Sequence, residues 1–356
     1  MPMIPHSRPT LAPQDIAAVT AVLESGWLAQ GEATVAFEAA LASQVGGVGA
    51  VATSSGTAAL HLALLALNVG PGDEVMLPSY VCAALLNAVR FVGATPIPVD
   101  IEEEDYNLSP ADVRRKLTRR TRVLLVPHTF GLAADLKQLS DLGVPIVEDC
   151  AQALGATLDG RPAGGLADFA VFSFYATKVI TTGEGGMVVT RSTALRDRIA
   201  DLRDYADKED DRVRYNYKMT DMQAALGLSQ LQRLPTFINR RRELAARYSR
   251  TLCATRLILP CDLPGRPHIF YRYVIRMDQD VEACRERLAR QGVRAERPIF
   301  KPLHEYLGLR RGFAITERAM RTSLSIPLYP SLSDEESDRV VQAVLEEYDG
   351  RRAAAT

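Results

Sequence analysis

The residue best suited to covalent chemistry is Lys178, which ends the segment Phe172-Ser-Phe-Tyr-Ala-Thr-Lys178 just before a glycine-rich turn. Burial disfavours the charged form of a lysine and lowers its pKa, which makes the amine nucleophilic. The aromatic and aliphatic neighbours of Lys178 favour such burial. Lys178 is therefore a candidate for a Schiff base with a carbonyl compound. The alternative is that it is a surface charge, as most lysines are.

A second candidate segment is Thr53-Ser-Ser-Gly-Thr-Ala-Ala-Leu60, which follows an apolar run and begins a helical pattern. Gly56 lets the backbone approach a ligand closely, and the free N–H groups of a first helical turn attract an anion. Ser55 and Thr57 can add hydroxyl donors. The alternative is an ordinary strand-to-helix turn with a serine N-cap. The segment matches neither the Walker pattern nor G-x-G-x-x-G.

The third candidate segment is Pro145-Ile-Val-Glu-Asp-Cys-Ala-Gln152, in which an apolar strand pattern ends in Glu148 and Asp149. Carboxylates at the carboxyl end of a parallel strand lie at the ligand crevice of such sheets. One of the two could pair with a cationic ring nitrogen, and Gln152 could reach a neighbouring oxygen. A solvated strand end or a helix cap is the alternative interpretation.

Taken together, the three segments offer the groups that pyridoxal phosphate (PLP) needs. A desolvated lysine holds the aldehyde, a carboxylate keeps the pyridine ring protonated, and a helix N-terminus takes the phosphate. Their order along the chain is compatible with one sheet formed by successive strands. The sequence therefore favours a PLP site built from Lys178, an acid at the end of a strand and the Gly56 turn.

The elements that must position these residues are predicted to form an α/β domain. Helix-like segments alternate with apolar β-type runs, a pattern typical of a mostly parallel sheet. The last strands lie close together in sequence, so we expect some of them to pair antiparallel. The predicted strands are Val48–Thr53, Glu74–Leu77, Thr95–Val99, Val123–His128, Pro145–Asp149, Phe169–Phe174 and Met187–Thr190, and the helix-like segments include Thr57–Leu67, Val81–Val89 and Pro110–Leu117.

The pattern of predicted elements changes near Thr220. Thr220-Asp-Met-Gln223 fits a capping box at the start of a helix, and a basic helix follows from about Ile238. The rest of the chain shows a smaller α+β pattern with a final helix after Ser333. We expect two domains, a large one at residues 1–240 and a small one at residues 241–356, with a cleft between them.

Composition excludes several classes of protein. The chain has 356 residues, 47% of them hydrophobic and 24% charged, and a net charge of −1. Disorder, collagen-like repeats and a global field for nucleic acid or an anionic membrane are disfavoured. The five cysteines are scattered without zinc-like spacing, so no metal is expected. With no apolar leader at the N-terminus, we expect a cytoplasmic protein with no membrane association.

Over nearly its whole length the chain resembles DegT-type sugar aminotransferases, which are fold-type I PLP enzymes. That resemblance implies a large domain with a mostly parallel seven-stranded sheet and a smaller α+β C-terminal domain. The segments that carry it are Gly26-Trp-Leu-Ala-Gln-Gly31, Ser54-Ser-Gly-Thr-Ala-Ala-Leu60, Gly70-Pro-Gly-Asp-Glu-Val75, Glu148-Asp-Cys-Ala-Gln-Ala153, Phe172-Ser-Phe-Tyr-Ala-Thr-Lys178, Thr181-Thr-Gly-Glu-Gly-Gly186, Tyr215-Asn-Tyr-Lys-Met-Thr-Asp221, Pro302-Leu-His304 and Ile326-Pro-Leu-Tyr-Pro330.

The resemblance also implies roles for individual residues. Lys178 would form the Schiff base with PLP and move protons, Asp149 would pair with the pyridine nitrogen, and Gln152 would lie near the phenolic oxygen of PLP. Asn216 would reach the phosphate of the neighbouring subunit in a homodimer. The phosphate of the chain's own cofactor would be bound by Gly56, Thr57, Ala58 and Ser173.

Two departures from the family pattern bear on the site. Cys82 stands where the family usually places an aromatic ring over the cofactor, and a sulfur covers less of that ring. The asparagine that usually follows the catalytic lysine is Val179 here. Cys82 is nevertheless a predicted cofactor contact, and the substitution bears on the range of substrates.

The function that the resemblance implies is amino transfer from glutamate or glutamine to a nucleotide-linked keto sugar, with pyridoxamine phosphate formed during turnover. One alternative is a PLP-dependent dehydratase or eliminase of the same fold. Lys178 argues against that branch, because its dehydratase members lack the lysine. The other alternative is a non-catalytic PLP-binding sensor. The joint presence of Lys178, Asp149, Gln152 and Ser173 argues against it, because a protein without catalytic chemistry would need none of them.

Overall fold

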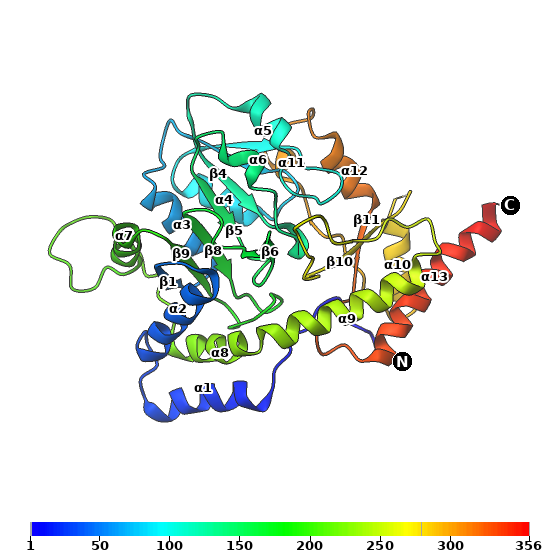
Figure 1. The fold of residues 1–356 in the computed structure, drawn as a ribbon, viewed down its shortest axis with the longest axis horizontal. Coiled ribbons are helices and arrows are strands. Elements are labelled where there is room, and N and C mark those ends of the chain that lie inside the picture. The colour runs from blue at the N-terminus through cyan, green and yellow to red at the C-terminus, as the bar shows by residue number, and fades with distance from the viewer. Residues whose placement is uncertain (1, 279, 356) are drawn as a thin grey trace.

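The computed structural model describes residues 2–278 and 280–355. Figure 1 shows a large body built on one sheet and a small body beside it, joined by the long helix α9 (Leu234–Leu252). Near its start α9 contributes Phe237 to the core of the large body, and further along it contributes Tyr248 to the core of the small body. Because one helix serves both cores, the boundary at residue 240 stays a proposal.

The sheet of the large body has seven strands in the order β1-β9-β8-β5-β4-β2-β3. All neighbouring pairs are parallel except those of β9, which runs antiparallel to both β1 and β8. The predicted α/β class and the antiparallel pairing among the last strands are confirmed. The strands are β1 (Gly49–Thr53), β2 (Glu74–Pro78), β3 (Thr95–Val99), β4 (Thr121–Pro127), β5 (Ile146–Asp149), β8 (Phe169–Ser173) and β9 (Gly186–Thr190).

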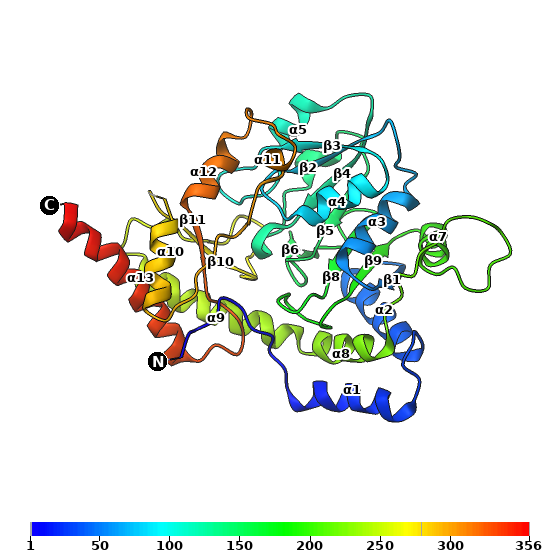
Figure 2. The ribbon, with the colours of Figure 1, turned by 180° about the vertical axis from the view of Figure 1, so that it is seen from behind.

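Both faces of the sheet are buried, which explains the nearly continuous apolar strands. Val171 and Val188 pack with α3 and α4 on one face, and Phe172 and Met187 pack with α2 and α8 on the other. Figure 2 shows α3 and α4 on the face opposite α8. The helices of this body are α1 (Pro13–Ser25), α2 (Glu32–Val45), α3 (Gly56–Ala66), α4 (Ala83–Phe91), α5 (Pro110–Lys116), α6 (Lys137–Ser140), α7 (Thr193–Arg203) and α8 (Asp221–Gln232), with a short 3-10 helix η1 (Thr129–Gly131) and a hairpin of β6 (Thr157–Leu158) and β7 (Arg161–Pro162).

Local signals in the sequence account for several helix starts. Thr220 and Gln223 form the predicted capping box of α8, and Ser55 caps α3. The helix predicted from Ile238 begins earlier, at Leu234, because Pro235 lies in its first turn, where proline is tolerated.

The small body pairs β10 (Tyr273–Arg276) with β11 (Ser323–Ile326) in antiparallel fashion. Its core also takes Ile4 from the N-terminal segment, which forms an isolated bridge with Val293. Its helices are α10 (Glu282–Arg290), α12 (Ala314–Thr322) and α13 (Asp334–Ala355), whereas α11 (Leu303–Tyr306) packs on the large body, whose core includes Leu303. Across the described residues, no helix is long and apolar enough to cross a membrane.

Candidate active site

A cavity of about 200 Å³ lies where the carboxyl ends of β5 and β8 meet the first turns of α3 and α4. It brings together most of the residues predicted from three separate segments of the chain. The predicted residues that line it are Gly56, Thr57, Cys82, Asp149, Ser173 and Lys178. Ligands bind at this edge of open α/β sheets, so the location agrees with the expected crevice.

The N-terminus of α3 forms one wall. Ser55 Oγ accepts a hydrogen bond from the Ala58 N–H at 3.1 Å, so in this structure that amide serves the cap. The other N–H groups of the first turn lack acceptors within their own helix. A Cβ added to Gly56 would lie 2.8 Å from Ser173 Cβ, which is closer than real contacts. Only glycine at position 56 therefore lets the Ser173 hydroxyl lie beside this anion-attracting turn.

Asp149 lines the cavity and is 6% exposed. Its Oδ1 accepts a hydrogen bond from the Ala151 N–H at 3.0 Å, which leaves Oδ2 for a ligand in the cavity. Burial raises the pKa of the Asp149 carboxyl, although the Ala151 amide and the charge of Lys178 oppose that rise. A cationic partner, such as a protonated ring nitrogen, would restore the ionised form of the Asp149 carboxyl.

The neighbouring Glu148 lies away from this cavity. Its Oε2 accepts hydrogen bonds from His128 Nε2 at 3.0 Å and the Gly164 N–H at 2.7 Å, while Oε1 accepts from Leu166 and Ala167 at 2.8 and 2.6 Å. Successive strand residues face opposite sides of a sheet, so the two acids separate. The open choice between Glu148 and Asp149 is thus resolved in favour of Asp149 as the acid of the cavity.

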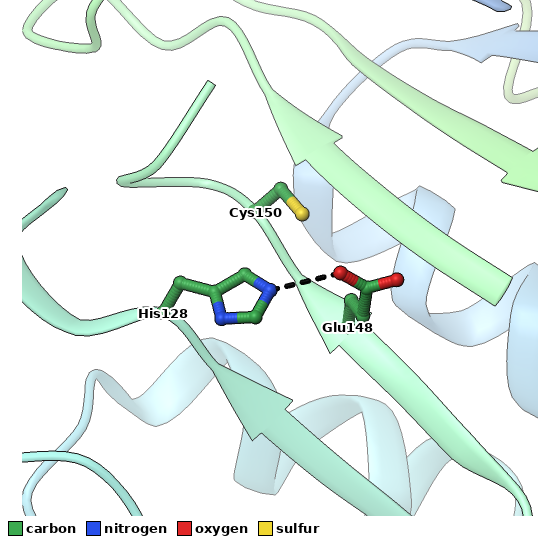
Figure 3. A group of neighbouring side chains, drawn as sticks. All are labelled: His128, Glu148 and Cys150. Atoms are coloured by element: carbon green, nitrogen blue, oxygen red, sulfur yellow. Dashed lines mark hydrogen bonds and ion pairs between the residues drawn. The ribbon is translucent and has the colours of Figure 1, made fainter. Parts of the chain in front are cut away.

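Figure 3 shows Glu148 with His128 and Cys150, whose ligand-type atoms lie within 4.8 Å of one another. His128 Nδ1 accepts a hydrogen bond from the Ala134 N–H at 2.9 Å, so Nε2 carries the proton that it donates to Glu148. Burial raises the pKa of Glu148, but His128 and the backbone amides outweigh it and the net direction is downward. The Nε2 proton of His128 and both carboxylate oxygens of Glu148 are already used in hydrogen bonds. The group therefore anchors the loop at 163–167 and does not suit a metal ion.

Lys178 follows β8 and lies in the same cavity as Asp149 and Ser173. Its Nζ is 5.5 Å from the centre of the Tyr271 ring. The flanking Phe174, Val179 and Ile180 are buried, as the sequence predicted, but Tyr175 is 47% exposed and Lys178 itself is only half-buried, because its side chain faces the open cavity. Tyr271 was not predicted, because a lone tyrosine distant in sequence from Lys178 carries no local signal. Sequence reasoning also missed Leu60, Tyr175 and Glu184 as cavity residues.

Cys82 precedes α4 and exposes its side chain to the cavity. Surrounding protein raises the pKa of its thiol, against the opposing charge of Lys178. Gln152 does not line the cavity directly. Its Oε1 accepts a hydrogen bond from the Phe130 N–H at 2.9 Å, so the amide nitrogen is the end that can donate to another group.

Asn216 is exposed and does not line the cavity of its own chain. It lies between Tyr215 and Tyr217, whose rings stack with centres 4.9 Å apart. The carbonyl of Tyr217 accepts a hydrogen bond from the Ser54 N–H at 2.7 Å, which ties this segment to the start of α3. The connection between α7 and α8, which ends in this segment, extends away from the sheet in both views (Figures 1 and 2).

The model of the DegT/DnrJ/EryC1/StrS aminotransferase family matches residues 9–345. The chain belongs to this family. A GDP-perosamine synthase of Caulobacter vibrioides is 33% identical to it over 365 residues, covering 97% of this chain and 98% of the relative. A GDP-perosamine synthase of Escherichia coli O157:H7 is also 33% identical, with coverage of 98% and 99%.

Solved structures of family members have the same fold. The aminotransferase TlmJ from Streptoalloteichus hindustanus is 36% identical, with a TM-score of 0.93 over 99% of this chain and 100% of that chain. The sugar aminotransferase Spr1654 from Streptococcus pneumoniae, in its PLP form, is 28% identical, with a TM-score of 0.93 over 98% and 99%. A PMP form of the same protein also matches.

These matches confirm the predicted family, the fold-type I architecture and the aminotransferase class. The predicted cofactor, PLP with its pyridoxamine form during turnover, is confirmed at the level of the family. Membership of an enzyme family also disfavours the alternative of a non-catalytic sensor.

Proposed function

We propose that this chain transfers an amino group from glutamate or glutamine to a nucleotide-linked keto sugar, with PLP bound covalently to Lys178. The observation that carries the proposal is that Lys178, Asp149 and the first turn of α3 meet in one cavity. Because the curated relatives are named GDP-perosamine synthases, a GDP-linked keto sugar is the first acceptor to test.

The residues present fit the cofactor. The gap between Gly56 and Ser173 is one that a single added Cβ would close, and it lies at a helix N-terminus suited to a phosphate. The free Oδ2 of Asp149 suits a protonated ring nitrogen, and the Gln152 amide is the donor for a phenolic oxygen. When bound, PLP supplies an electron sink for the carbanion left by proton loss beside the nitrogen.

The chain's own residues then have distinct tasks. Asp149, ionised opposite the ring nitrogen, favours the protonated ring. Lys178 attaches the cofactor and, once its amine is released, can move a proton from one carbon to another. Thr57 and Ser173 orient the phosphate from the α3 end, and Cys82 contributes its side chain to the same cavity as Asp149.

We further propose a homodimer in which Asn216 reaches the cofactor phosphate of the partner subunit. Two observations support it: Asn216 is exposed outside its own cavity, and Trp27, in the loop before α2, is 82% exposed although it is a large apolar residue. An exposed tryptophan suits a face covered by another chain. The five free cysteines suit the reducing cytoplasm in which we propose that the enzyme acts.

Borohydride reduction followed by peptide mapping tests the attachment site. The adduct is expected on the peptide that contains Lys178 and is expected to be lost in Lys178→Ala. An adduct on another lysine would remove the proposed role. Incubation of the pyridoxamine-loaded enzyme with a panel of nucleotide-linked keto sugars then identifies the acceptor, because the absorbance of the lysine–PLP Schiff base returns only with a substrate.

Mixed dimers test the role of Asn216. If it acts in the partner's site, Lys178→Ala chains mixed with Asn216→Ala chains form heterodimers in which one site carries both changes and the other is intact. Activity should then return on mixing. If heterodimers form without activity while Asn216→Ala alone is impaired, the residue serves its own chain.

A further inference from the structure

Tyr271 comes from the segment leading into β10, is buried, and lies beside Lys178, a residue of the cavity. It belongs to the core of the large body, although the strand that follows it belongs to the small body. Its ring centre lies 5.5 Å from Lys178 Nζ, and Thr177, the residue before that lysine, interacts with its phenol group. Tyr271 therefore links the small body to the lysine itself.

The backbone around Tyr271 is held firmly. A Cβ on Gly131 would lie 2.7 Å from the Tyr271 nitrogen, so η1 and this segment are in close contact. The Ile269 N–H donates to the Gly131 carbonyl at 3.0 Å, and Arg241 Nη1 donates to the Tyr271 carbonyl at 3.1 Å. Gln152 holds the same η1 turn through the Phe130 N–H. The position of the Tyr271 phenol is therefore set by its contact with the η1 turn, and the same turn is bound by Gln152, a predicted cofactor residue.

Three cations surround this phenol. Lys178 faces it from the loop after β8, Arg241 from α9, and the Arg272 guanidinium lies 5.3 Å from the ring centre. Burial raises the pKa of Tyr271, but these charges, together with Thr177, lower it to about 8. Two acids line the cavity with Lys178: Asp149, whose pKa is influenced by the charge of that lysine, and Glu184.

We propose that Tyr271 is the proton partner of Lys178. In the step that we infer, the N–H bond of the Lys178 ammonium breaks and an O–H bond forms on the Tyr271 phenolate. The N–H bonding pair stays on nitrogen as its lone pair, and a lone pair of the phenolate oxygen forms the O–H bond, so the products are a neutral amine and a neutral phenol. The reverse transfer recharges the lysine. The proposal rests on the proposed function, in which Lys178 must be a free amine each time it attacks or takes a proton.

The test uses the cofactor-free protein, so it does not depend on the identity of the sugar. Tyrosinate absorbance is titrated between pH 6 and pH 11. Of the twelve tyrosines, one is expected to ionise near pH 8 in the wild-type chain, and Tyr271→Phe is expected to lack that step. Tyr273→Phe is the matched control, because burial raises the pKa of Tyr273 to about 12 and its loss should leave the step unchanged. Circular dichroism verifies that each variant is folded.

Lys178→Met tests the coupling between the two groups. Removal of the ammonium is expected to move the low tyrosine step upward by about 1 pH unit. In the PLP-loaded enzyme, Tyr271→Phe should lower kcat about 100-fold with little change in KM for either substrate. The proposal is overturned if the wild type lacks the low step, if Tyr271→Phe retains it, or if Lys178→Met leaves it in place. Failure of Lys178 to hold PLP, detected by borohydride mapping, would instead overturn the proposed function.

Discussion

Gly56→Ala tests the close contact on which the proposed phosphate site depends. Two effects oppose each other at this position. Alanine in place of glycine favours a helix by about 0.8–1.0 kcal/mol in its interior and by less in a first turn. Against that, the new Cβ would lie 2.8 Å from Ser173 Cβ, where ordinary contact begins at 3.4 Å, so the two atoms must separate by about 0.6 Å.

Ser173 cannot move easily, because it ends β8 in register with Gly186 and follows the buried Phe172. Overpacking of this kind costs about 1–3 kcal/mol, which exceeds the helical gain. We expect a net loss of about 1–2 kcal/mol in the free energy of unfolding of the cofactor-free protein. The methyl group fills the space between the turn and Ser173 and displaces the serine, which should also remove at least one charge-assisted hydrogen bond to the phosphate and weaken PLP binding about 10- to 100-fold.

Urea unfolding measures the first effect, and a titration of PLP absorbance measures the second. Gly70→Ala is the control, since the nearest atom to its new Cβ is 4.0 Å away and its φ is not positive. Adding Ser173→Gly to Gly56→Ala leaves Ser173 Cα at 3.4 Å as the nearest remaining contact and should recover stability without recovering PLP affinity. A Gly56→Ala protein as stable as the wild type, with unchanged PLP affinity, would refute the reasoning.

Three further predictions concern buried groups. Glu148→Gln should lose about 3 kcal/mol of unfolding free energy, because four donors then meet a neutral amide. Because the pKa of Glu148 is lowered in the folded protein, the unfolded wild-type chain takes up this proton at a higher pH than the folded protein does, so wild-type stability falls in the acid range and the urea midpoint of Glu148→Gln should fall less steeply. Burial lowers the pKa of His268 to about 3, so wild-type stability should fall as the pH drops from 6.5 toward 3. His268→Asn keeps an acceptor for the Phe270 N–H, and its thermal midpoint should depend less on pH. Asp221 accepts hydrogen bonds from the Gly31 and Thr34 N–H groups at 2.7 and 3.0 Å. Asp221→Ala should therefore lower the free energy of unfolding by about 3 kcal/mol and speed proteolysis before α2. Equal cleavage rates in the variant and the wild type would contradict this anchoring role.

The sequence alone was sufficient for the parts of the site that depend on neighbours along the chain. Apolar runs between polar turns located the seven strands, and Thr220 with Gln223 located the start of α8. The Gly56 turn and Lys178 were identified for the same reason. Each lies at the junction of one strand and the segment that follows it, and such a junction is specified by a few consecutive residues.

Tertiary structure alone decided which groups meet. It separated Glu148, bound to His128, from Asp149 in the cavity, and it brought Tyr271 beside Lys178. It also placed the Gly56 turn directly against Ser173. These outcomes depend on strand order, on the face that each residue presents and on helix packing, and they join residues far apart in the chain. Periodicity records which residues are buried, but the partner of a buried polar group is set only when the sheet and its helices close around it.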